Sequence, residues 1–109
     1  MNPLDSRKAA TATFVVLTSA LYLARRFEES INAGRRALAF APQANVARKY
    51  VALSLAQLDR IDEARAEIAE LIKHQPGASQ AWFRQRGFPN KWMEELHLEG
   101  LRKAGLRQE

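Results

Sequence analysis

Apolar residues recur at helical spacing along the chain, and their pattern predicts a series of helices joined by short polar turns. We expect helices over residues 6–24, 27–40, 44–58, 61–74, 80–84 and 91–104. Pro42 and Pro76 follow the second and fourth segments and should end them. Ser79 and Asn90 precede the last two segments and are good helix-capping residues. No segment shows the alternation of apolar and polar residues that indicates a β-strand, so the expected fold class is all-α.

Residues 26–42 and 60–76 are two copies of one pattern at a constant offset. The identical positions are Arg26 and Arg60, Glu29 and Glu63, and Pro42 and Pro76. A fixed period of about 34 residues is typical of the tetratricopeptide repeat (TPR), a helix–turn–helix unit that stacks into a solenoid. The interval from Arg26 to Arg60, which we call the repeat period, has this length, and the chain therefore resembles the TPR family. The resemblance implies one domain over residues 1–109, with repeats at about 7–42 and 44–76.

The repeat pattern weakens after the second repeat, and residues 79–105 are expected to form a capping segment. Trp82 falls at the aromatic position of a third unit, but Gly87, Phe88 and Pro89 break the helix that would follow. In the last helix we expect Trp92, Leu96 and Leu101 to face inward. The aromatic residues of this segment could stack on nucleic-acid bases, but we interpret them as the core of a cap.

In the TPR family a concave face binds peptides, and the register places six side chains of this chain on it. They are Val15, Ser19 and Tyr22 from the first repeat, and Lys49, Leu53 and Ala56 from the second. The predicted groove is mostly apolar, with Lys49 as one cation. The resemblance therefore implies a protein or peptide partner, either an apolar helix or an extended peptide with one acidic group.

Val16 and Leu23 lie seven residues apart in the first helix and therefore on one stripe. No preceding repeat covers this stripe within the chain, and exposed apolar stripes often mark contact sites. We expect self-association there, as a two-fold homodimer that brings the same stripe from each subunit.

A narrower resemblance rests on three short segments, residues 2–5, 81–84 and 98–106. They look like the C-terminal region of bacterial class III adenylate/guanylate cyclases that carry TPR units. Nothing in the chain resembles the cyclase domain itself. This resemblance implies a regulatory role in signalling, as an alternative to a non-catalytic protein-interaction module.

Composition and charge narrow the classes of function. The 109 residues carry a net charge of +5 and no cysteine, which fits a globular, cytoplasmic protein in a reducing compartment. The arginine pairs could contact nucleic acid, a third function, but interleaved acidic residues favour solvated helix faces. The uncharged stretch 9–24 is shorter than the ~20 residues of a membrane span. We therefore expect no membrane partner.

Chemistry-bearing residues are scattered along the sequence. His74 and His97 each stand alone, whereas a metal site needs several converging ligands. The adjacent carboxylates, Glu28/Glu29, Asp62/Glu63 and Glu94/Glu95, lie in the first turns of helices or on polar faces. There they interact with the helix dipole or with solvent. Neither a phosphate-binding glycine loop nor a nucleophile motif occurs in the sequence. We therefore expect no catalytic residue, no metal and no cofactor.

Overall fold

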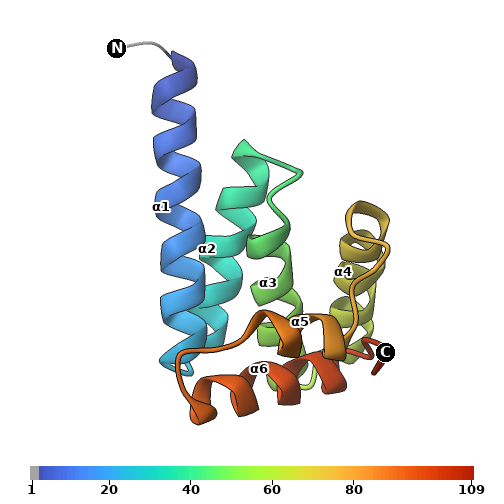
Figure 1. The fold of residues 1–109 in the computed structure, drawn as a ribbon. Coiled ribbons are helices and arrows are strands. Elements are labelled where there is room, and N and C mark those ends of the chain that lie inside the picture. The colour runs from blue at the N-terminus through green and yellow to red at the C-terminus, as the bar shows by residue number, and fades with distance from the viewer. Residues whose placement is uncertain (1–2) are drawn as a thin grey trace.

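The structure, a computed structural model, describes residues 3–109, with side chains from Ser6 onward, and contains helices but no strand in that range (Figure 1). The helices are α1 (Pro3–Leu23), α2 (Phe27–Phe40), α3 (Asn45–Gln57), α4 (Ile61–His74), α5 (Gln80–Arg86) and α6 (Lys91–Lys103). The all-α prediction is confirmed. The expected helices 27–40 and 61–74 agree with α2 and α4 at both ends. Of the segment 2–5, residue 2 lies outside the described residues.

The ends of α5 and α6 follow from the residues that flank them. The side chains of Ser79 and Asn90 accept hydrogen bonds from the backbone N–H groups of Trp82 and Met93, at 3.0 and 3.1 Å. Each therefore satisfies a donor that the first helical turn leaves unpaired. Gly87 ends α5 with φ of 82°, a conformation that glycine adopts without steric cost. The chain can turn sharply there, and α6 leaves in a new direction.

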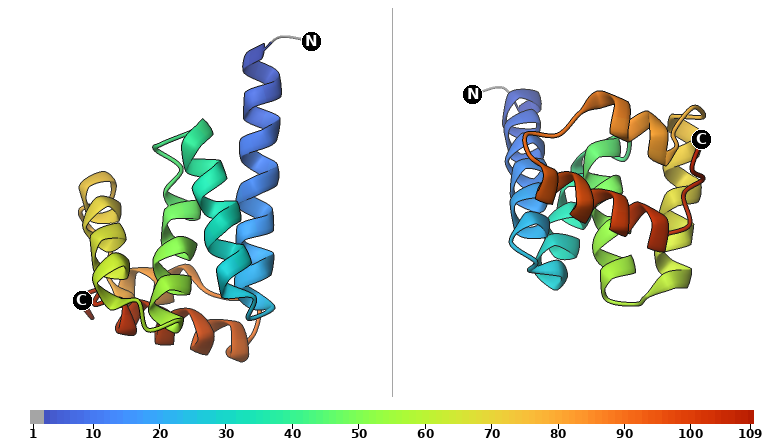
Figure 2. Two further views of the ribbon diagram at one scale, coloured as in Figure 1. Left: turned by 180° about the vertical axis from the view of Figure 1, so that it is seen from behind. Right: turned by 60° about the horizontal axis from the view of Figure 1, so that its bottom comes forward.

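Helices α1 to α4 lie side by side with alternating direction, and each packs on the next along the chain (Figures 1 and 2). α1 also packs on α3. α6 runs crosswise to these helices and packs on α3 (Figure 2). None of the helices within residues 3–109 is both long and apolar enough to cross a membrane.

The backbone recurs with the same repeat period as the sequence. Arg25 and Asp59, at equivalent turns, both have positive φ, 60° and 63°. The next residues, Arg26 and Arg60, donate equivalent backbone hydrogen bonds of 2.9 Å back to the preceding helix. We refer to α1 with α2 as unit 1, and to α3 with α4 as unit 2.

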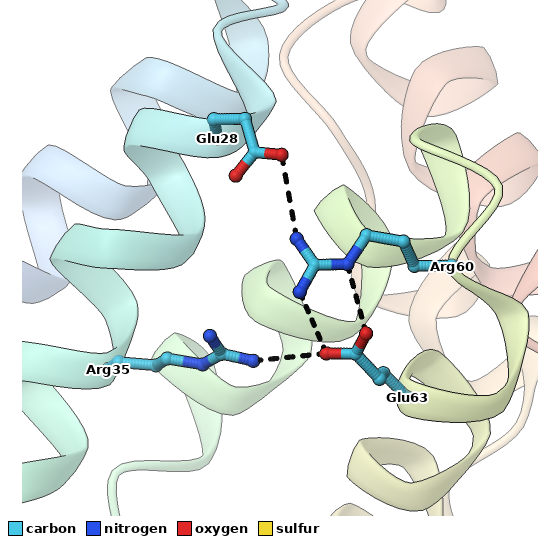
Figure 3. Close-up of polar contacts among 4 residues, drawn as sticks. All are labelled: Glu28, Arg35, Arg60 and Glu63. Atoms are coloured by element: carbon cyan, nitrogen blue, oxygen red, sulfur yellow. Dashed lines mark hydrogen bonds and ion pairs between the residues drawn. The ribbon is translucent and has the colours of Figure 1, made fainter.

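Four charged side chains join the two units (Figure 3). The Arg60 guanidinium donates to both oxygens of Glu63, at 3.0 and 2.9 Å, and lies 3.5 Å from Glu28 of unit 1. Arg35 of unit 1 donates to Glu63 at 3.4 Å. Exposed ion pairs contribute at most about 1 kcal/mol each. The network therefore connects the two units but contributes little to the stability of the fold.

The core lies where the two units and α6 meet. Its large, fully buried apolar side chains are Tyr22, Ile31, Val51, Leu53, Leu55, Leu71 and Leu101. Ala37 and Ala64 are fully buried, as predicted. The prediction that Trp92 faces inward is wrong, because its side chain is 52% exposed. Trp92 lies in the first turn of α6, and the apolar contact surface of α6 begins only at Leu96.

Ala64→Leu should lower the melting temperature clearly. The site is already filled, and overpacking a core costs ~1–3 kcal/mol. For a domain of this size each kcal/mol shifts the transition by roughly 4–8 °C. Circular dichroism melts should show this loss, while the control Ala66→Leu, on the exposed side of α4, should melt like the wild type. An unchanged melting curve for Ala64→Leu would contradict the predicted repeat register.

Candidate ligand-binding face

The six predicted groove residues lie on one pair of helices, Val15, Ser19 and Tyr22 on α1 and Lys49, Leu53 and Ala56 on α3. We call the surface that they form the α1/α3 face. Tyr22, Leu53 and Ala56 are buried, whereas Val15, Ser19 and Lys49 are partly exposed. The difference has a physical cause, because α6 lies across one part of the face and leaves the other part open.

Backbone and side-chain hydrogen bonds hold α6 on this face. The Tyr22 hydroxyl donates to the Leu96 carbonyl at 2.6 Å and accepts from Gln57 Nε2 at 3.2 Å. Gly100 of α6 lies directly against Tyr22 and Leu53. A Cβ placed on Gly100 would be 2.6 Å from the Tyr22 hydroxyl and 2.8 Å from Leu53 Cγ. Only glycine therefore allows α6 to approach α1 and α3 this closely.

His97 is the buried polar contact between α6 and α3. Its Nδ1 is 2.8 Å from the Met93 carbonyl, which can only accept, so Nδ1 carries the proton. Nε2 of the neutral ring then accepts from the Tyr50 hydroxyl at 2.9 Å. Burial, and after it the positive charge of Lys49, lowers the pKa of His97 to about 4. The neutral ring is thus the form that this contact requires at neutral pH.

Lys49, one of the residues of the α1/α3 face, also lines a cavity of about 280 Å³. Its lining comes from α3, the end of α4, α5 and the segment after α5. The lining residues are Asn45, Val46, Lys49, Gln75, Trp82, Phe83, Arg86, Gly87 and Phe88. We call it the Lys49 cavity. Neither aspartate nor glutamate lines it, so its charge is positive.

Lys49 lies among aromatic rings in this cavity. Its Nζ is 4.3 Å from the ring centroid of Tyr50 and 5.2 Å from that of Phe83. Burial lowers the pKa of Lys49 to about 8, because the charged ammonium loses water and no acidic side chain of the described residues pairs with it. The second cation that lines the cavity, Arg86, lies over Trp82, with its Cζ 3.2 Å from the ring centroid.

Part of this arrangement was beyond sequence reasoning. The sequence predicts the cation at Lys49, but it places the aromatic side chains of Trp82, Phe83 and Phe88 in the core of a cap. His97 was considered only as an isolated histidine. The one signal for its contact is the buried stripe of α6, since His97 shares a helical face with Gly100, Leu101 and Ala104.

The predicted self-association stripe is only partly exposed. Val16 is 66% exposed, but Leu23 is partly buried and packs against the core. Val16 and Leu23 therefore do not form one continuous open stripe. Within residues 3–109 no three His, Cys, Asp or Glu side chains come close enough together to hold a metal ion.

No family model matches the chain, and neither a curated protein nor a solved structure is significantly similar to it.

Proposed function

We propose that the chain is a non-catalytic protein-interaction module of the TPR type, which binds a peptide segment of a partner protein on its α1/α3 face. The observation that carries the proposal is the position of α6. An amphipathic helix of the same chain already lies on this face, with Leu96 and Leu101 buried against it and Glu95 exposed. The face therefore has the shape and chemistry that accept an apolar helical surface.

The open end of the face supports the same proposal. Val15 and Ser19 of α1 and Lys49 of α3 remain partly exposed beyond α6. These residues offer apolar surface, a hydroxyl and a cation to a segment that lies next to α6. The repeat period shared by sequence and backbone supports the TPR-type arrangement, in which the first helix of each unit lines the binding face.

Selection of random peptides on the full chain tests this function. A displayed library of fifteen-residue peptides is selected against the wild type, and the enriched peptides are measured by calorimetry. We expect micromolar binding that the double variant Val15→Glu/Ser19→Glu reduces at least tenfold, because acidic groups on the face repel an acidic peptide and disrupt apolar contact.

The matched control is Ala66→Glu/Ala69→Glu, which adds two acidic groups to exposed positions of α4. This control should bind the peptides like the wild type. The proposal is wrong if no enriched peptide distinguishes the α1/α3 variant from the α4 variant.

A further inference from the structure

The Lys49 cavity combines two kinds of chemistry in a small space. Three aromatic side chains, Trp82, Phe83 and Phe88, line it together with Lys49, whose ammonium lies 5.2 Å from the ring centroid of Phe83. Its volume, about 280 Å³, is at the lower end of what ligand-binding sites enclose. The cavity can hold one large apolar group with its immediate neighbour, but not a whole helix.

The unmatched charge indicates which neighbour is needed. A cation in an apolar cavity is costly unless an anion or a set of hydrogen-bond acceptors compensates it. Lys49 Nζ lies near the rings of Tyr50 and Phe83 and forms no hydrogen bond or ion pair with a described residue, and no described carboxylate lines the cavity. Arg86 is a weaker anchor than Lys49, because its side chain is exposed to water and its guanidinium stacks on Trp82.

We propose that the Lys49 cavity binds an aromatic side chain and an adjacent acidic side chain of the partner's peptide, the aromatic ring against Trp82 and Phe88 and the carboxylate on Lys49. This inference rests on the proposed function and names the peptide chemistry that the open end of the α1/α3 face selects. An acidic group is required because it supplies the counter-ion that the cavity lacks. An aromatic group is favoured because Val46, Trp82, Phe83 and Phe88 form a large apolar part of the wall, beside the polar side chains of Asn45, Gln75 and Arg86.

Paired probes separate charge from shape. The ¹⁵N-labelled full chain is titrated with the blocked dipeptides acetyl-Asp-Trp-amide and acetyl-Asn-Trp-amide, and binding is followed at the Trp82 indole N–H. At neutral pH we expect the acidic dipeptide to bind at least tenfold more tightly. Lys49→Met should abolish this preference. The control Arg84→Met, at an exposed position of α5 outside the cavity, should retain it.

The pH dependence gives an independent readout. The titratable and charged groups that face Lys49 are Tyr50 from α3, Arg86 from α5 and His97 from α6. His97 is already neutral above pH 7, burial raises the pKa of Tyr50, and arginine keeps its charge. Lys49 is thus the group that changes charge, and the acidic preference should fall roughly tenfold between about pH 7.5 and about pH 9.

Lys49→Arg completes the test, because an arginine stays charged over this range. It should retain the acidic preference and lose its pH dependence. A third probe, 2-naphthoate, represents a free aromatic acid. The proposal is overturned if both dipeptides bind equally, if Lys49→Met keeps the preference, or if naphthoate alone binds. Failure here together with selected peptides that still need Val15 and Ser19 would leave the proposed function intact.

Discussion

Replacing Gly100 with leucine is expected to lower the free energy of unfolding by about 3 kcal/mol, near the upper end of what overpacking costs. The first added carbon would already lie 2.6 Å from the Tyr22 hydroxyl and 2.8 Å from Leu53 Cγ. Neither neighbour can move freely, because both side chains are fully buried and the Tyr22 hydroxyl is hydrogen-bonded to the α6 backbone. The remaining three carbons would force α6 away from α3.

Urea denaturation measures the loss, and hydrogen exchange of the α6 amides shows where it occurs. Gly77→Leu is the matched control, because a Cβ at Gly77 meets nothing within 4 Å. It should change stability by no more than about 0.5 kcal/mol. Equal stability of the two variants would mean that α6 does not dock on α1 and α3 through Gly100.

Acidification below about pH 6.5 should destabilise the fold through His97. The pKa of His97 is about 4 in the folded chain, against 6.5 in the unfolded chain. The folded state therefore binds fewer protons than the unfolded state between these values, and stability falls as pH falls from 6.5 towards 4. At 1.36 kcal/mol per pKa unit the loss amounts to about 3 kcal/mol. Above pH 6.5 this loss from His97 is absent.

His97→Gln isolates this effect, because glutamine has no charge to gain. Its amide can still donate to the Met93 carbonyl and accept from the Tyr50 hydroxyl. Denaturation curves of both proteins should therefore converge as the pH is lowered from 6.5 to about 4.5. Below that range Glu63, Glu70 and Glu99, whose pKa values are lowered by basic partners, titrate in both. Parallel stability curves between pH 6.5 and 4.5 would contradict the assignment to His97.

Local chemistry made much of the fold predictable. Pro42 and Pro76 cannot continue a helix, and Ser79 and Asn90 cap one, so each acts within a few residues of its own position. The repeat period extended that information, because Arg26, Glu29 and Pro42 recur at equivalent positions as Arg60, Glu63 and Pro76. Both sources describe segments and their neighbours along the chain.

The position of α6 is not determined by local sequence and could not be predicted. It depends on a turn at Gly87 and on contacts such as Tyr22 with Leu96, which are 74 residues apart. Periodicity marks which side of α6 is apolar but does not select the surface that receives it. The Lys49 cavity is equally beyond periodicity, since its lining joins residues of α3 with residues of α5 and with Phe88.

The ion-pair network between the units is not symmetric, because each unit contributes a different pair of positions to it. Glu28 of unit 1 pairs with Arg60, and Arg35 of unit 1 pairs with Glu63 of unit 2. We call Glu28 and Arg35 the presenting positions of a unit, and Arg60 and Glu63 the receiving positions. A shift by one repeat period shows where the same charge pattern is present or missing. Arg26 and Glu29 form the equivalent receiving pair on unit 1, joined at 2.7 Å with both side chains exposed.

On the far side the charge pattern ends. Asp62 still matches Glu28, but Ala69 stands where Arg35 stood, and the receiving positions after unit 2 hold Glu94 and His97. A duplicate of residues 27–60 inserted in tandem would carry both sets of charged positions, so each new interface would have the complete network. In a copy appended after unit 2, the residue equivalent to Glu63 would face Ala69 and would have no cation to pair with. Internal duplication of this segment would therefore lengthen the series of units, and each added unit would form the same ion-pair network with its neighbour.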